Sequence, residues 1–264
     1  MQPMINISLR AIRSSNEQLM QILERDSGKI ATAQDLKRFL SQIEMNYHEN
    51  ISRALARAYP AHKIAKRGDF LGADKGFSWH ISNIHNPLSF LRGLPDWGIS
   101  IVCKKGGVAE HAILTCPATQ DEFTASRGSG ASLNGKRIRV SSVAALENAI
   151  IATSILPAPL TQEDSISLTL FKELASASFQ IRTSHCAALD LANVAAGRLD
   201  AAILDQTTPA DLSAALLLCK EAGGLAGDFN GQPATDSAKR VVCANPKLFK
   251  VTTQKLHSLR ERTV

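Results

Sequence analysis

The chain has 264 residues, of which 44% are hydrophobic and 20% charged, a composition typical of a globular protein with a substantial buried core. The longest purely apolar runs, such as Ala214 to Cys219, are far shorter than the ~20 residues that a membrane-spanning helix needs, and no apolar signal-peptide core is evident near the N-terminus. The formal charge of +6 is spread over short basic clusters, which favours a solvated basic surface and leaves contact with RNA as an alternative.

The N-terminal residues show helical periodicity. Hydrophobic residues recur every three or four positions between Ile5 and Leu23, apart from a gap near Asn16, and again between Leu36 and Leu55. We therefore expect two amphipathic helices, the second of which begins at an N-cap, Thr32, and ends before Pro60.

Between residues 97 and 140 the pattern changes to short strands. Strand-like runs are separated by glycine and proline, and Asn134-Gly135 stands between two such runs, which is a strong signal for a hairpin. The pattern predicts an antiparallel sheet that the two N-terminal helices flank.

After residue 147 strands and helices alternate. The predicted strands are 149–153 and 201–204, and the predicted helices are 165–177, 186–196 and 211–222. This order is typical of an α/β arrangement, so we expect an N-terminal α+β lobe over residues 1–147 and a C-terminal α/β lobe over residues 148–264.

The cysteines indicate a reducing compartment. They are five, an odd number, and no pair has zinc-ligand or C-x-x-C redox spacing: Cys103, Cys116, Cys186, Cys219 and Cys243. We expect reduced, mostly buried thiols and a cytoplasmic protein without a membrane partner.

Several stretches, in order from one end to the other, resemble the inositol monophosphatase family, and most closely its bacterial SuhB-type branch. They are Met1 to Ile7, Tyr59-Pro60-Ala61-His62, Phe123 to Ala131, Leu133-Asn134-Gly135, Ala187 to Ala192, Ala195 to Asp200 and Glu221-Ala222-Gly223-Gly224. The resemblance implies the layered αβαβα sandwich of the sugar-phosphatase type, usually in a homodimer.

The resemblance also implies a reaction. Family members hydrolyse phosphate monoesters with magnesium held by a Glu-Glu pair, an Asp-Pro-Ile/Leu-Asp-Gly-Thr loop and a later Trp-Asp, and an early Thr-x-x-Asp positions water. The matching positions in this chain are Arg67-Gly68 for the pair, Ser82 and His85 for the loop aspartates, Asn86-Pro87 for Gly-Thr, Asp211 for the late aspartate, and Ser41 and Glu44 for the early motif. The Gly-Ser near the substrate falls on His185-Cys186.

The charge at these positions argues against a metal. Arg67 is positive, Asp211 is negative, and Ser82 and neutral His85 carry no charge, whereas the family site offers four acidic ligands. Repulsion between Arg67 and a divalent ion would cost on the order of several kcal/mol at ~4 Å. We therefore expect a vestigial site, with no metal cofactor and no magnesium-dependent catalysis.

Each remaining side chain has a structural explanation as well. Asp211 is explained by a role as a helix cap. Glu44 can lie on a solvated helix face or be a partner for Arg67. His85 and His185 can be ordinary structural histidines that hydrogen-bond within the protein. The alternative is that Arg67, His85 and His185 converge into a pocket that binds an anion without metal, since arginine offers a fork to phosphate oxygens.

Three functions follow from these observations. The first is a non-catalytic interaction or regulatory protein, since the SuhB-type resemblance implies a role in transcription antitermination and ribosomal RNA synthesis, with a protein of the transcription machinery or RNA as partner. The second is a residual or altered phosphate-monoester hydrolase of the inositol-1-monophosphatase type, with Mg or with His85 or His185 as acid or base. The third is a metal-free sensor of a phosphorylated metabolite.

Overall fold

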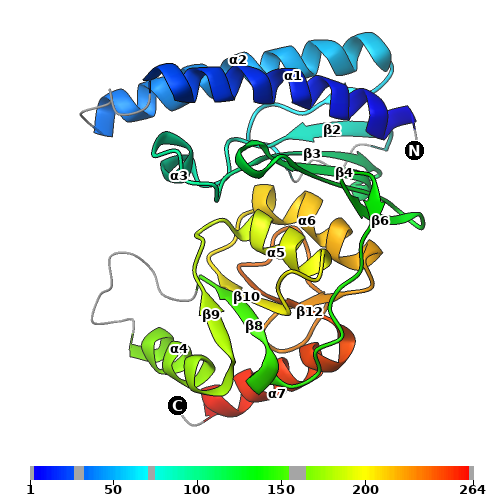
Figure 1. Ribbon diagram of the computed structural model, residues 1–264. Helices are drawn as coiled ribbons and strands as arrows, with labels where there is room; N and C mark the ends of the chain where they lie inside the picture. Colours follow the sequence, from blue (N-terminus) through cyan, green and yellow to red (C-terminus); the bar gives the residue numbers. More distant parts are fainter. Residues whose placement is uncertain (1–2, 27–32, 71–74, 155–164, 262–264) are drawn as a thin grey trace.

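The computed structural model describes residues 3–26, 33–70, 75–154 and 165–261. Its helices and sheets form five layers, in the order helix, sheet, helix, sheet, helix (Figure 1). The predicted αβαβα sandwich is thereby confirmed.

The first layer is a pair of long helices, α1 (Pro3–Asp26) and α2 (Ala33–Ala58), which pack side by side on one sheet. Their predicted hydrophobic stripes are buried: Ile5, Leu9, Ile12, Leu19, Ile43, Tyr47, Ile51 and Leu55 face the core. The proposed N-cap of the second helix, Thr32, lies outside the described residues.

The second layer is a seven-stranded sheet whose strands follow chain order. They are β1 (Lys63–Ile64), β2 (Phe77–Ile81), β3 (Ile99–Lys105), β4 (Val108–Cys116), β5 (Asp121–Ser126), β6 (Gly130–Leu133) and β7 (Lys136–Arg137). All neighbours pair antiparallel except β1 and β2, which are parallel. Asn134 and Gly135 connect β6 to β7 with positive φ angles of 50° and 77°, which confirms the predicted hairpin.

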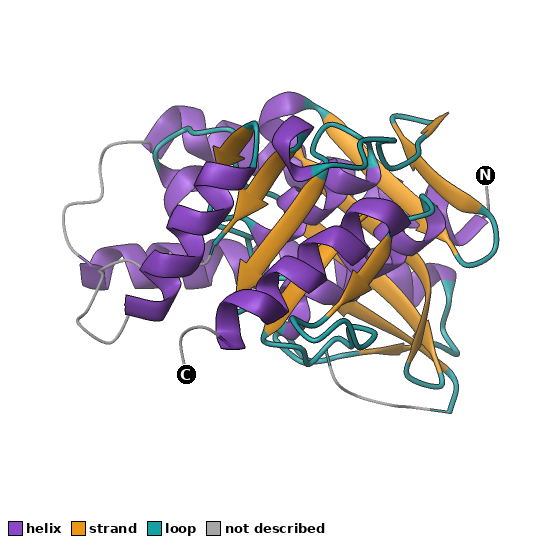
Figure 2. Ribbon diagram, turned by 90° about the horizontal axis from the view of Figure 1, so that it is seen from below, coloured by secondary structure: helices purple, strands orange, loops and turns teal. Residues whose placement is uncertain are grey.

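The last three layers are built after residue 147. A five-stranded sheet has the order β11-β12-β10-β8-β9, and its strands are β8 (Ile150–Thr153), β9 (Gln180–Arg182), β10 (Ala201–Asp205), β11 (Leu225–Gly227) and β12 (Arg240–Ala244). Helices α5 (Ala187–Ala195) and α6 (Pro209–Glu221) lie between the two sheets, and α4 (Ser165–Ala177) and α7 (Pro246–Glu261) cover the outer face. Figure 2 shows the helices lying in front of and behind the strands.

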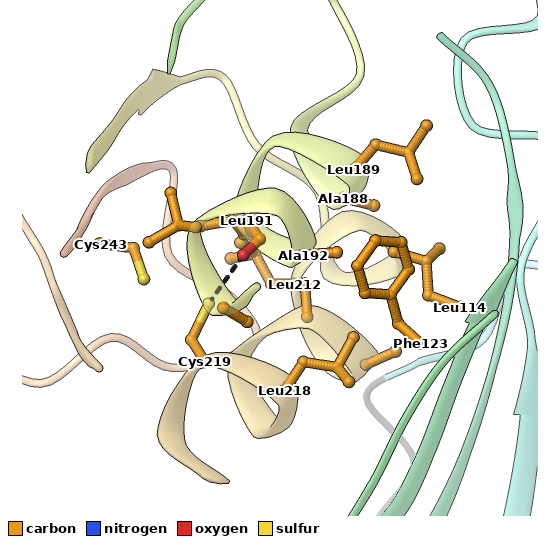
Figure 3. Packing of buried hydrophobic residues seen from close by; sticks show 14 of the residues in the cluster. Leu114, Phe123, Ala188, Leu189, Leu191, Ala192, Leu212, Leu218, Cys219 and Cys243 are labelled. Carbon is orange, nitrogen blue, oxygen red and sulfur yellow. Dashed lines mark hydrogen bonds between the residues drawn. The ribbon is translucent and has the colours of Figure 1, made fainter. Parts of the chain in front are cut away.

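The central helix layer joins the two sheets through one apolar core. Leu191 of α5 and Leu218 of α6 are fully buried there, against Phe123 of the first sheet and Cys243 of the second (Figure 3). Since α5 and α6 follow residue 147 but pack on both sheets, they unite the parts before and after it. The division into lobes 1–147 and 148–264 stays a prediction.

Five strands and two helices of the structure were absent from the sequence-based expectation. They are β1, β2, β9, β11, β12, α7 and the short helix α3 (Pro87–Leu91). All five cysteines are free and buried, as expected. Among the helices of the described residues, none combines the length and apolarity needed to cross a bilayer.

Candidate functional site

The positions matched to the family's metal ligands and to its water-positioning motif fall on four segments that meet beside the first sheet. Glu44 lies on α2, Arg67 follows β1, His85 follows β2, and Asp211 lies in the first turn of α6. The structure brings these residues together in two separate pairs.

The first pair is Arg67 and Glu44. The Nη1 atom of Arg67 lies 3.7 Å from Oε2 of Glu44 and donates a hydrogen bond to the Ser41 carbonyl at 3.2 Å. The other oxygen of Glu44 accepts the amide of Ile84 at 3.1 Å. Burial raises the pKa of Glu44, while the Ile84 amide and the charge of Arg67 lower it by less. Both oxygens of this carboxyl group are therefore engaged within the protein.

The second pair is His85 and Asp211, which are 126 positions apart in the chain. Nδ1 of His85 lies 3.2 Å from Oδ1 of Asp211, and Nε2 lies 3.0 Å from the hydroxyl of Ser100. The His85 side chain is only 3% exposed. With both ring nitrogens bonded inside the protein, His85 occupies a structural position.

The other oxygen of Asp211 helps to cap the N-terminus of α6. It accepts hydrogen bonds from the Thr208 amide at 3.0 Å and the Thr208 hydroxyl at 2.7 Å, and the Thr208 side chain accepts the Asp211 amide in turn. Burial favours a higher pKa for Asp211, but the hydrogen bond and charge of His85 together with Thr208 lower the pKa overall. This reciprocal arrangement is a capping box, so Asp211 does serve as a helix cap.

Ser82 directly follows β2 and is hydrogen-bonded to the neighbouring strand β3. Its side chain is fully buried and accepts the Ser100 amide at 2.8 Å, while its carbonyl accepts the hydroxyl of Tyr47 at 2.7 Å. The pKa of Tyr47 is raised well above its usual value, mainly by burial, which keeps this phenol a donor.

Asn86 and Pro87 start the short helix α3. Asn86 has a left-handed conformation with φ 53°, and its side-chain oxygen accepts the amide of Ser89 at 3.3 Å. Its side-chain nitrogen donates to the Ser184 carbonyl at 3.0 Å. Proline suits the first helical position because its missing amide hydrogen is not needed there. The Asn86-Pro87 replacement therefore has a local structural role.

A cavity of about 720 Å³ lies beside these segments. Its wall includes Asn86, Arg92, His185, Asp205 and Asp211. His185, a candidate anion contact, is exposed and has φ 56°.

The other two candidate anion contacts, Arg67 and His85, are not among the residues that line this cavity. Arg67 is held by Glu44 and Ser41, and His85 is buried against Asp211 and Ser100. Of the three basic side chains, only His185 lines this cavity.

The carboxylates present do not fit a magnesium ion of the family's kind. Magnesium requires near-octahedral oxygen ligands, but Glu44 and Asp211 already have an arginine and a histidine as neighbours. Within the described parts of the chain, no group of three or more histidine, cysteine, aspartate or glutamate side chains is placed to hold a metal ion.

Two contributors to this region were not found from the sequence. Ser100 bonds both Ser82 and His85, and no local pattern marks it. Thr208 had a signal, because Thr208-Pro209-Ala210-Asp211 matches the Ser/Thr-x-x-Asp/Glu form of a helix start.

Known proteins resemble this chain over nearly its full length. The profile of the inositol monophosphatase family matches residues 1–262. The Nus factor SuhB of Pseudomonas aeruginosa is 39% identical over 256 residues, which are 95% of this chain and 94% of that protein. The Nus factor SuhB of Escherichia coli K12 is 31% identical over 252 residues, with 95% and 94% covered.

Solved structures agree. The extragenic suppressor protein suhB of Bartonella henselae superposes with a TM-score of 0.82 at 26% identity, covering 97% of this chain and all of that one. A Thermotoga maritima IMPase has a TM-score of 0.82 at 24% identity and covers 99% of both chains, which bears on the fold alone. Because the family profile spans almost every residue and the layers match those of solved members, this chain belongs to the inositol monophosphatase family.

Proposed function

We propose that this chain is a non-catalytic member of its family that acts as an interaction or regulatory protein of the bacterial transcription machinery. The observation that carries the proposal is the Arg67–Glu44 pair, because it puts a guanidinium where the family has a metal-binding glutamate. A magnesium ion at this position would meet the positive charge of Arg67 in place of a carboxylate ligand.

The remaining positions support the same conclusion. The metal-ligand position Ser82 has an uncharged side chain that accepts the Ser100 amide. His85 contacts Asp211 through Nδ1, at a position where the family pattern has a second carboxylate. Each substitution is accommodated by a specific partner, which supports a site remodelled for structure.

The similar proteins support the partner class. Two relatives that are 39% and 31% identical over about the whole chain are Nus factors. On that basis we infer a cytoplasmic protein whose partner belongs to the transcription machinery. We also infer a homodimer, as the family resemblance implies.

The first test is phosphate release. The purified chain is incubated with inositol 1-phosphate and other monoesters, with magnesium or with a chelator, and released phosphate is measured. We expect no magnesium-dependent turnover. Turnover that requires magnesium and disappears in Asp211→Asn would contradict the proposal and identify an altered phosphatase.

The second test is partner capture. The tagged chain is used to capture proteins from a native lysate of its host, with and without ribonuclease, and the captured proteins are identified by mass spectrometry. We expect RNA polymerase-associated factors in both arms and none with the tag alone. Loss of all factors after ribonuclease would indicate an RNA partner, and absence in both arms would contradict the proposal.

A further inference from the structure

A second cavity, of about 510 Å³, lies between the β3–β4 hairpin, helix α6 and residues 234–237. None of its lining residues also lines the cavity that contains His185 and Asp211. A ligand bound here would therefore be separate from the family's reaction site.

The two cavities differ in charge. The second cavity is lined by three cationic side chains and one carboxylate, which are Lys104, Arg127, Lys220 and Asp236. The cavity beside Asp211 has the opposite balance, with one arginine and three aspartates. Of the two, only the second offers an excess of positive charge, which favours an anion.

The carboxylate of the second cavity is already neutralised. Lys104 has a side chain only 3% exposed, and its ammonium group lies 2.5 Å from Oδ2 of Asp236 and donates to the Phe70 carbonyl. The hydroxyl of Ser213 donates to the same Asp236 oxygen at 2.9 Å. These contacts make a rigid polar wall in which Asp236 does not repel an incoming anion.

The other two cations differ in their partners. Nε of Arg127 lies 3.2 Å from Oε1 of Glu110, and the guanidinium donates hydrogen bonds to the Ala109 carbonyl, so it is held in place. Lys220 is exposed at the end of α6, and no ion pair joins it to another of the described residues. Lys220 is thus the cation available to a ligand.

The rest of the wall is largely apolar. Phe70 and Leu217 are buried, and Val108, at 47% exposed, lies at the opening. The three hydroxyl side chains that also line the cavity already hydrogen-bond to other protein side chains. A ligand with many hydroxyl groups would therefore find few free partners, whereas an aromatic or aliphatic body would bury surface there.

We propose that this cavity binds a small phosphate ester or phosphonate with an apolar body, with Lys220 contacting the anionic group and the Phe70–Leu217 wall contacting the body. The inference does not depend on the proposed function. It requires neither a metal nor turnover.

The probe is phenylphosphonate, because a phosphonate cannot be hydrolysed by a residual phosphatase. Calorimetric titration of the full-length protein, with chelator present, is expected to show binding that weakens as salt is added. Methylphosphonate and inositol 1-phosphate should both bind about tenfold more weakly, since neither places apolar surface on the wall.

Matched variants place the site. Lys220→Ala should weaken phenylphosphonate about tenfold, and Lys220→Arg should retain most of the affinity. The control is Arg92→Ala, which removes the cation of the other cavity and should leave binding unchanged. No binding at millimolar phenylphosphonate, or a loss in Arg92→Ala that equals the loss in Lys220→Ala, would overturn the proposal. Equal affinity for methylphosphonate would overturn it too.

Discussion

His85 and Asp211 contact each other across 126 positions of sequence, with Nδ1 and Oδ1 3.2 Å apart, and so link the edge of the first sheet to the start of α6. In the family pattern both positions are acidic metal ligands. Here one of the two positions is a histidine, and the two side chains contact each other directly.

Asp211→Asn should lower the free energy of unfolding at pH 7 by about 1–2 kcal/mol, because it weakens both the cap with Thr208 and the contact with His85. The folded-state pKa of Asp211 is depressed, so its contribution is present above the unfolded-state pKa of about 3.9 and is lost as pH falls through the lower folded value. Urea unfolding at pH 7 and at about pH 3 measures this difference. The control is Glu17→Gln, an exposed site on α1, and an Asp211→Asn effect equal at both pH values would contradict the argument.

Glu44→Ala should destabilise the protein by about 1–3 kcal/mol, because the buried amide of Ile84 loses its acceptor. Glu44→Gln should cost less, since its amide oxygen still accepts that hydrogen bond. The two variants are compared by chemical denaturation, and equal losses would show that charge, rather than the acceptor, dominates at this position.

The pH dependence of Glu44 has the opposite sign to that of Asp211. Its folded-state pKa is raised, so stability that is present below the unfolded-state pKa of about 4.3 is lost as pH rises through the folded value. The difference in the free energy of unfolding between Glu44→Gln and the native chain should therefore be more favourable to the variant at pH 7 than at about pH 4. Unfolding curves of both proteins at the two pH values measure this difference. If the variant compares better at pH 4 than at pH 7, the charge of Arg67 affects the pKa of Glu44 more than burial does.

Glu221→Ala should loosen the turn between β5 and β6. The two oxygens of this carboxylate accept the amides of Gly128 and Gly130 at 2.8 Å each, which joins the end of α6 to the first sheet. We expect a loss of about 1–3 kcal/mol and faster hydrogen exchange at those two amides. Lys136→Ala, on the neighbouring hairpin, is the control, and unchanged exchange in Glu221→Ala would contradict the role.

Leu218→Ala should be among the more damaging single changes, at about 2–5 kcal/mol, because its side chain is fully buried in the central helix layer (Figure 3). Leu225→Ala, at a position 46% exposed, should cost far less. Thermal or urea unfolding of the pair gives the comparison, and similar losses would mean that the layer repacks around the missing side chain.

Local sequence patterns predicted the elements that are specified by residues close together in the chain. The stripes from Ile5 to Leu23 and from Leu36 to Leu55 became α1 and α2, and Asn134-Gly135 became the β6–β7 turn, because spacing and turn chemistry act within a few residues. The strand β2 was missed although Phe77, Trp79 and Ile81 alternate with polar residues. The intervening Ser78 and His80 are also buried, in polar contacts with the protein, so the strand has no solvent face.

The amino-acid sequence by itself determined the family, because residue identity at matched positions carries that resemblance. It also predicted which acidic positions of the family pattern are replaced. Only the tertiary structure decided that Arg67 contacts Glu44, that His85 contacts Asp211 and that, of these four side chains, only Asp211 lines the cavity that contains His185. The physical reason is that such contacts join α2 to the segment after β1 and the first sheet to α6, and their distances exist only once the layers have packed.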